Sequence, residues 1–172
     1  MSSDSGKPDV RTAQQAIVRQ IADDVIGKMY IDGIPVDWTR IDLIYTLVGN
    51  AWTVVDEIFD PELSNLEMPL PAMLDQPFAK PPPLQPLREM MYVPGEGTWF
   101  TMHLTIRSDG EVSTNFGYDQ PQSYAEEDVE TDLRMYPRHT VPEWMQNDLI
   151  IARQLAAERG RRQPLWRRLL RR

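Results

Sequence analysis

The chain has 172 residues, of which 41% are hydrophobic, a formal net charge of -8 and no cysteine. This length favours one domain with a core of its own. The lack of cysteine excludes disulfides, thiolate catalysis and cysteine-ligated metals, and the apolar runs are too short to span a bilayer, so we expect a cytoplasmic protein without stable membrane association.

The charges are distributed unevenly along the chain. Residues 159–172 hold seven arginines and no acid, so residues 1–158 carry 11 basic and 26 acidic side chains, a net charge of -15. We predict a single domain over 1–158 and a basic tail over 159–172. A body this acidic repels nucleic acid and attracts basic proteins. A basic stretch with apolar residues also suits a membrane surface or nucleic acid, but the charges favour a tail that docks on the acidic body or frays.

The first half of the chain changes from a helix pattern to a strand pattern. Residues 10–28 space their apolar side chains for an amphipathic helix. Residues 41–47 alternate apolar and polar side chains, and Gly49-Asn50 supplies a turn, so we expect a hairpin that returns through 52–59. Residues 61–94 contain nine of the fifteen prolines, which predicts a long extended loop. We expect no helix across "KPPPLQP" and a short one over 87–92.

The second half gives the clearest strands. Residues 100–106 alternate apolar and polar side chains, "SDG" turns the chain, and residues 112–118 alternate back. Thr140 and Glu143 match the spacing of a capping box, which predicts a last helix over about 141–159. The order of elements predicts an α+β fold, in which an antiparallel sheet of two hairpins packs with N-terminal and C-terminal helices.

The densest acidic stretch follows the second hairpin, with six acids in fourteen positions: Asp119, Glu126, Glu127, Asp128, Glu130 and Asp132. Ser123 and Glu126 form a capping-box pair, so a capped helix with a solvated face accounts for much of this pattern. The alternation points Tyr118 inward and leaves Tyr124 exposed beside the acids. Acids with exposed tyrosines are also typical of protein-binding surfaces. Both interpretations stay open on the residues alone.

No catalytic arrangement is visible in the sequence. His103 falls on the polar side of a strand and His139 follows a Pro-Arg pair, and neither has the spacing of a metal motif. "PGEGTW" lacks the lysine and the strand-turn-helix setting of a phosphate loop. We therefore expect no catalytic residue, no metal and no cofactor, and a protein that is not an enzyme. Surface or partner contact is the expected role of both histidines.

Several short motifs together suggest a family. They are Trp99, Asp109-Gly110, Phe116, Tyr118-Asp119, Tyr136-Pro137-Arg138, Pro142-x-Trp144 and the earlier "WTRIDLIYTLVGNAW". With these motifs the chain resembles bacterial polymorphic-toxin immunity proteins of the YezG-like group, among them immunity factors for tuberculosis-necrotizing-toxin-type NAD glycohydrolases. The resemblance covers about residues 10–60 and 97–156. The proline-rich loop and the arginine tail have no counterpart in it.

The resemblance implies a non-enzymatic antitoxin that binds a cognate toxin domain, as a monomer in a 1:1 complex, and blocks its active site. An acidic body suits this role because it steers a basic partner toward it. An adaptor or scaffold that uses the proline-rich loop and basic tail to bind a host complex or membrane is the alternative, and a hydrolase is a third hypothesis. The residues expected to contact the toxin are Asp119, Tyr124, Glu126, Glu127, Glu130, His103 and Trp99.

Overall fold

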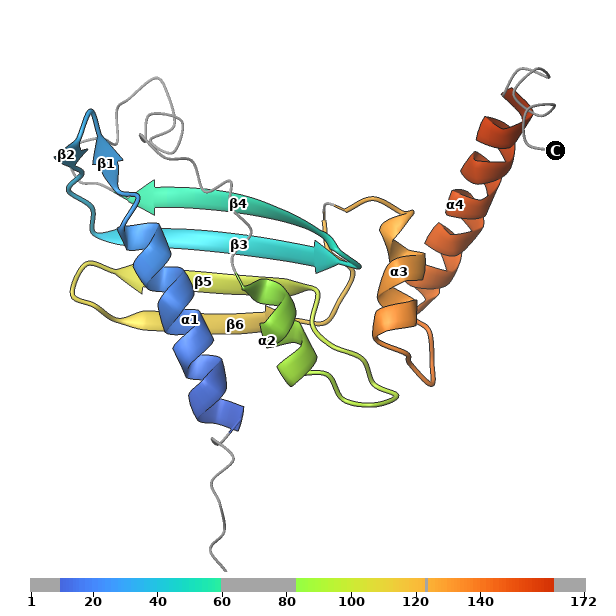
Figure 1. Cartoon of the computed structure of the whole chain (residues 1–172), viewed down its shortest axis with the longest axis horizontal. Coiled ribbons are helices and arrows are strands. Elements are labelled where there is room, and N and C mark those ends of the chain that lie inside the picture. The colour runs from blue at the N-terminus through green and yellow to red at the C-terminus, as the bar shows by residue number, and fades with distance from the viewer. Residues whose placement is uncertain (1–9, 60–82, 123, 163–172) are drawn as a thin grey trace, which may run out of the picture.

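The computed structural model describes residues 10–59, 83–122 and 124–162. Its elements are, in chain order, α1 (Val10–Ile26), β1 (Tyr30–Ile31), β2 (Ile34–Pro35), β3 (Arg40–Val48), β4 (Ala51–Phe59), α2 (Leu84–Met90), β5 (Thr101–Arg107), β6 (Val112–Gly117), α3 (Asp128–Met135) and α4 (Glu143–Arg162). Figure 1 shows one four-stranded sheet with helices against it and beyond its end. The fold is α+β with antiparallel sheets, as the sequence predicts.

The four-stranded sheet has the order β4-β3-β5-β6. Each hairpin predicted from the alternation is present, and the two hairpins join through antiparallel pairing of β3 with β5. Val48 pairs with Ala51 across the Gly49-Asn50 turn. Gly49 has a φ of 59°, which glycine adopts without steric cost. The turn therefore fixes the register of the longest hairpin.

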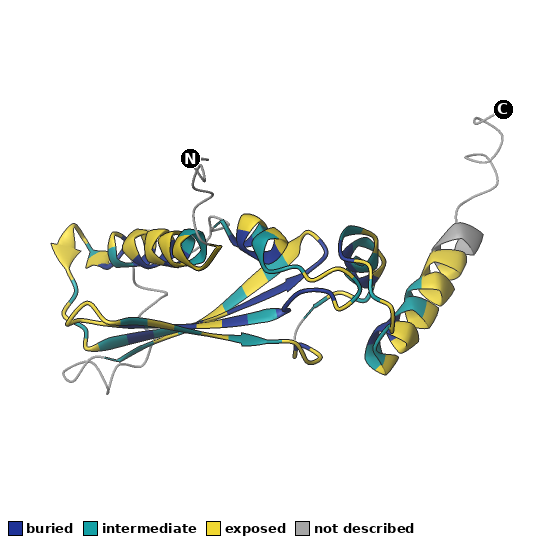
Figure 2. Cartoon of the chain, turned by 90° about the horizontal axis from the view of Figure 1, so that it is seen from below, coloured by how far each residue is buried: buried dark blue, intermediate teal, exposed yellow. Residues whose placement is uncertain are grey.

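The main core lies between one face of this sheet and two helices. Alternate residues of β3 and β5 on that face are buried, and α1 and α2 cover them (Figure 2). Among its buried residues are Ile41, Leu43, Tyr45 and Leu47 from β3, Met102, Leu104 and Ile106 from β5, Ile21, Val25, Leu84 and Leu87 from the helices, and Trp99. Burying one such side chain contributes about 1.5–3 kcal/mol. Because successive side chains of a strand point to opposite faces, the residues between these buried ones form the opposite face of the sheet.

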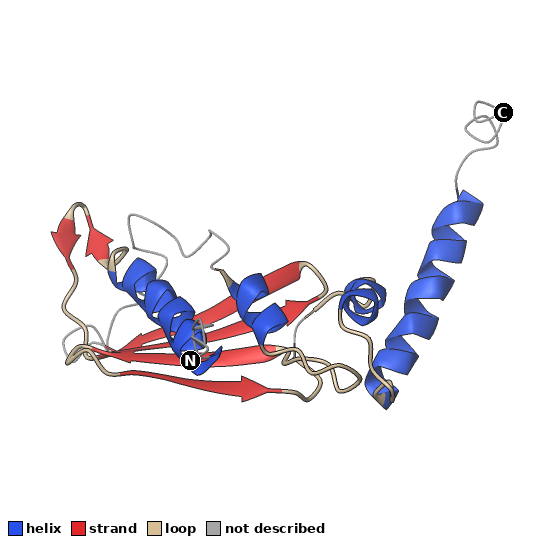
Figure 3. Ribbon diagram, turned by 60° about the horizontal axis from the view of Figure 1, so that its bottom comes forward, coloured by secondary structure: helices blue, strands red, loops and turns tan. Residues whose placement is uncertain are grey.

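A second, smaller core holds α3 and α4 at the end of the sheet. Val48, Phe100, Val129 and Met145 are buried in it, and Trp144 packs its ring against Phe100 with the centroids 5.1 Å apart. Beyond these contacts α4 leaves the body, as Figure 3 shows. Its later turns consequently expose Ile150, Ile151 and Leu155.

Three boundaries differ from the sequence prediction. The helix α2 begins at Leu84 and includes Pro86, which it tolerates because the first four N–H groups of a helix have no partner within it. The helix α3 begins at Asp128, so Glu126 and Glu127 lie in a turn before it. The helix α4 begins at Glu143 rather than directly after Thr140. The proposed cap Ser123 lies outside the described residues.

The small β1–β2 ladder is an element that the alternation does not predict. Its turn is Asp32-Gly33, and both residues have positive φ, 51° and 75°. An Asp-Gly pair is the usual sequence signal for such a turn, so the signal was present in the chain.

Candidate functional site

The face of the sheet opposite α1 and α2 is covered by no helix in the described part of the chain (Figure 2). We call it the open face. It comprises Thr53, Val55 and Glu57 of β4, Asp42, Ile44 and Thr46 of β3, Thr101, His103 and Thr105 of β5, and Ser113 and Asn115 of β6. The register aligns these residues in rows across the strands. The central row is Val55, Ile44, His103 and Asn115.

Two aliphatic side chains lie at the centre of this polar surface. Val55 is 64% exposed and Ile44 is 37% exposed, and they are direct cross-strand partners. His103 pairs with Ile44 from the other side and is exposed as the sequence predicts. Sequence reasoning missed the pair, although its signal exists: Ile44 and Val55 are apolar residues at positions where the alternation demands polar ones. Exposed apolar groups within a polar rim are typical of contact surfaces.

The polar residues next to this pair are held by one another. Thr105 donates its hydroxyl hydrogen to Asp42, at 2.8 Å, and Arg40 Nε lies 2.9 Å from the other carboxylate oxygen. The guanidinium of Arg40 also stacks over the Phe59 ring, 3.8 Å from its centroid. These contacts fix the geometry of the face beside the Ile44–Val55 pair.

The acidic stretch borders the open face at one end. A groove of about 250 Å³ has Thr46, Val48 and Thr53 on the strand side. Its other wall is Tyr124, Ala125 and Asp128. We call residues 119–122 and 124–130 the acidic rim. Burial raises the pKa of Asp128, and the neighbouring Glu127 carboxylate raises it further. The rim therefore places Asp128 in the groove at the end of the open face, with the exposed Glu127 and Glu130 next to it in the chain.

Most of the acids predicted to meet a partner lie at the surface. Asp119, Glu127 and Glu130 are exposed and Glu126 is half-buried. Asp132, the last acid of the cluster, is different because it is fully buried. The helix α3 thus presents acids outward and sends one inward, beside the buried Val129 and Tyr136.

Three aromatic residues do not lie where the sequence places them. Trp99 is fully buried and packs on Phe116, with ring centroids 5.3 Å apart, so it offers no surface to a partner and its assignment to the interface is wrong. Tyr118 is 53% exposed rather than inward, because β6 ends at Gly117 and the alternation stops with it. Tyr124 is half-buried rather than free.

The contacts of Tyr124 explain its burial. Its hydroxyl donates to the carboxylate of Asp148 on α4 and accepts from Gln120, and its ring meets Trp144 with centroids 5.4 Å apart. Burial raises its pKa to about 12, and the bond to Asp148 acts in the same direction. Tyr124 therefore joins the rim to α4, and only part of its ring is available to the groove.

The base of α3 is fixed by a buried ion pair that the sequence does not reveal. Arg88 Nη2 lies 2.8 Å from Asp132 Oδ1, and the Gly49 N–H donates to the same oxygen at 2.9 Å. Arg88 Nε donates to the carbonyl of Trp99. The pair links α2, α3, the β3–β4 turn and the chain before β5. Asp132 therefore belongs to this buried pair and not to the solvated face of the helix.

The glycine-rich segment before β5 is a structural turn. Gly95 and Gly97 have φ of 85° and 93°, and a Cβ on Gly97 would lie 2.1 Å from the Arg138 guanidinium carbon. Arg138 donates to the carbonyls of Glu96 and Thr98, and its burial lowers its pKa. The His139 N–H donates to the Gly95 carbonyl. The motif "PGEGTW" thus makes room for Arg138 and His139.

Residues 10–59, 83–122 and 124–162 contain no group of three or more His, Asp or Glu side chains placed to hold a metal ion. No helix within these ranges has the length and apolarity needed to cross a membrane. Residues 60–82, which include most of the proline-rich loop, and residues 163–172, which form most of the basic tail, lie outside the described residues. The adaptor hypothesis depends on these two segments, so it concerns a part of the chain that the structure does not describe. Comparison with models of protein families and with curated proteins gives no match.

Proposed function

We propose that this protein is a non-enzymatic inhibitor of the immunity class, which binds a toxin domain through the open face and the acidic rim. The observation that carries the proposal is the exposed Ile44–Val55 pair set in a polar face beside exposed acids. An apolar centre with a charged border is the composition of a contact surface. The resemblance to immunity proteins supports the class of partner.

The two parts of the surface contribute differently to binding. The Ile44–Val55 pair loses water on contact and stabilises the bound complex, so it acts on dissociation. The rim acids attract a basic partner over several ångströms and speed its arrival. A toxin whose catalytic cleft is basic, as one that binds an anionic substrate such as NAD would be, fits both parts. The bound inhibitor then occludes the cleft, and no chemistry by this chain is required.

The test begins with the neighbouring gene: we expect it to end in a toxin domain, and that domain is co-expressed with this protein. Growth rescue and a stable complex of the two chains support the proposal, and growth arrest with no complex rejects it. Ile44→Arg and Val55→Arg should each weaken the complex at least about tenfold, or 1.4 kcal/mol. The matched control is Ile34→Arg on β2, whose side chain is 66% exposed but lies outside the open face. Equal binding by all three variants would place the interface elsewhere.

A further inference from the structure

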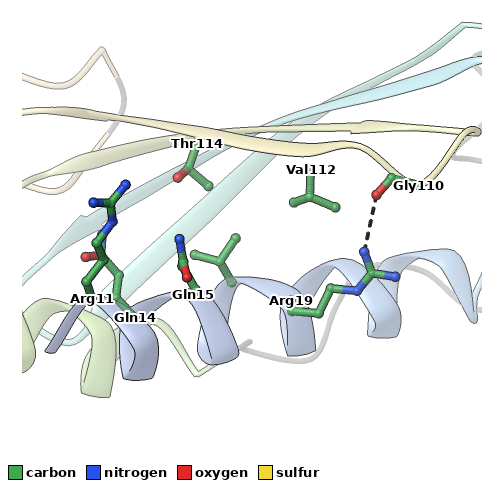
Figure 4. A pocket seen from close by; sticks show the side chains of 8 residues that line it. Arg11, Gln14, Gln15, Arg19, Gly110, Val112 and Thr114 are labelled. Carbon is green, nitrogen blue, oxygen red and sulfur yellow. Dashed lines mark hydrogen bonds between the residues drawn. The ribbon is translucent and has the colours of Figure 1, made fainter. Parts of the chain in front are cut away.

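A second groove lies on the other side of the sheet, between α1 and β6. Its volume is about 490 Å³, and Figure 4 shows Arg11, Gln14, Gln15 and Arg19 of α1 facing Val112 and Thr114 of β6 across it. Arg19 donates to the Gly110 carbonyl at 3.3 Å and pairs with Asp23 on its own helix. None of the residues that line this groove is acidic. Arg11 and Arg19 are the charged residues of the lining, and the charge of Arg19 is partly offset by Asp23.

One wall of the groove is the edge of the sheet. In the described part of the chain, β6 pairs only with β5. The Arg107 N–H donates to the Glu111 carbonyl, and in this register Ser113 and Asn115 also direct their backbone groups toward β5. The residues between them, Val112 and Thr114, direct their N–H and C=O groups away from the sheet. Val112 and Thr114 therefore line the groove with their side chains and also present, among the described residues, unpaired backbone groups at the edge of the sheet.

The helix α1 leaves space for another strand. Figure 1 shows that α1 crosses β5 and β6 and continues beyond the edge of β6. Its first turns, with Arg11, Gln14 and Gln15, stand over the position that a fifth strand would take. A strand added there would point every second side chain to the same side as Val112 and Thr114, toward α1. Those side chains would meet two arginines and two glutamines.

We propose that this groove binds an extended segment of a partner protein, which carries carboxylates at alternate positions and adds to β6 as a fifth strand. Backbone hydrogen bonds provide affinity in strand addition, and the pockets for alternate side chains provide specificity. A second copy of this chain fits less well, because β6–β6 pairing would bring the arginines of both copies together. This site uses a different surface and the opposite charge from the open face.

The test uses the full-length, ¹⁵N-labelled protein and an acetylated, amidated peptide of alternating valine and glutamate. We expect amide shifts and slowed hydrogen exchange at Val112, Thr114 and Phe116. A peptide with lysine in place of glutamate should bind at least about tenfold more weakly, or 1.4 kcal/mol. A glutamate peptide N-methylated at both its glutamates and its valines should lose the exchange protection, since it cannot donate N–H groups to β6 in either strand direction.

Two variants separate the backbone contribution from the charge contribution. Thr114→Pro removes an outward N–H, whereas its control Thr114→Val keeps it, so only the proline variant should lose binding. Arg11→Glu should weaken the glutamate peptide and strengthen the lysine peptide. If the proline variant does not fold, the N-methylated peptide tests the same ladder on the native protein, through the bonds that the peptide N–H groups donate to β6.

Three outcomes would overturn the proposal. The first is equal binding of the glutamate and lysine peptides. The second is that inorganic phosphate shifts the NMR signals of the Arg11 and Arg19 side chains as much as the peptide does, while the amides of Val112 and Thr114 gain no exchange protection. The groove would then be a simple anion site. The third is protection of these amides by self-association of the protein alone.

Discussion

Arg88 on α2 and Asp132 on α3 are both 0% exposed, and Arg88 Nη2 lies 2.8 Å from Asp132 Oδ1. The pair is only partly satisfied, since Arg88 Nη1 and Asp132 Oδ2 have no hydrogen-bond partner within the described residues. Taking two charges out of water costs several kcal/mol per ion, so such a pair adds little net stability. Its effect is instead on geometry, because Asp132 also accepts the Gly49 N–H and so sets α3 on the β3–β4 turn.

Removing one member of this pair should be costly. Arg88→Met leaves the Asp132 carboxylate buried without its partner, and we expect a loss of about 3–5 kcal/mol in the free energy of unfolding. Denaturant unfolding measures it. Arg134→Met, on the exposed side of α3, is the control and should change stability by about 0.5 kcal/mol or less. A similar loss in both variants would mean that the pair has no special role, and Arg88→Met with Asp132→Leu should recover part of the loss.

Asp56 is a half-buried acid on the helix-covered face, opposite Leu43. One of its carboxylate oxygens has no hydrogen-bond partner within the described residues, and burial raises its pKa. The folded state thus holds this proton more tightly than the unfolded state does. Ionisation of Asp56 therefore costs stability as the pH rises from the unfolded pKa, about 3.9, through the folded one.

The consequence is a pH-dependent gain for Asp56→Asn. This variant should be more stable than the native protein near neutral pH, and the difference should shrink as the pH falls toward about 4. Denaturant unfolding of both proteins at the two pH values measures the difference. Asp37→Asn, at an exposed position, is the control and should show no such trend. A gain that is constant with pH would have another cause than ionisation.

The elements show which parts of the fold the sequence makes predictable. Both hairpins follow from strict alternation because a strand with one buried face repeats every two residues, and their turns carry Gly49 and Gly110. The starts of the helices are predicted less well, because a capping box reports only on neighbouring residues. The position of α3 depends instead on the hydrogen bond from Gly49 to Asp132, which are far apart in the sequence.

The candidate site divides in the same way. The alternation places His103 on the polar face. The exposure of most rim acids could also be predicted, because so many charged side chains in a short stretch cannot all be buried. The burial of Trp99 and the bond between Tyr124 and Asp148 depend on packing of the second core, which no local pattern encodes. The Ile44–Val55 pair breaks the alternation and could have been found from that exception.

The attachment of α4 provides a test at this scale. Asp148 is 8% exposed and accepts the Tyr124 hydroxyl, so Tyr124→Phe leaves a buried carboxylate without this donor. We expect a loss of about 1–3 kcal/mol and faster hydrogen exchange in the first turns of α4. Tyr118→Phe is the matched control, because Tyr118 is 53% exposed. Unchanged exchange in α4 would show that the hydroxyl does not hold the helix.

At the scale of the whole molecule, two surfaces of opposite charge lie on different sides of one sheet. The open face adjoins the acidic rim, whereas the groove between α1 and β6 is lined by Arg11 and Arg19. Antiparallel sheets commonly leave one face uncovered, and their outer strands keep unpaired backbone groups. The fold therefore allows binding to the face and binding to the edge at the same time.

The last prediction concerns the rim in the complex with the toxin domain. Glu127→Lys with Glu130→Lys reverses two exposed charges and should slow association at least about tenfold at low salt, while dissociation changes less. Added salt should shrink the effect, because the screening length is about 10 Å at 0.1 M. Stopped-flow mixing measures both rates.

The control for this pair keeps the net charge equal. Glu89→Lys with Glu96→Lys changes the charge by the same amount at exposed positions on α2 and the glycine-rich turn, away from the open face. If steering depends on the rim, this control should slow association far less than the rim variant does. Equal slowing by both would indicate that only the net charge matters. An unchanged rate for the rim variant would mean that these acids form a solvated helix face, which is the other interpretation the sequence allows.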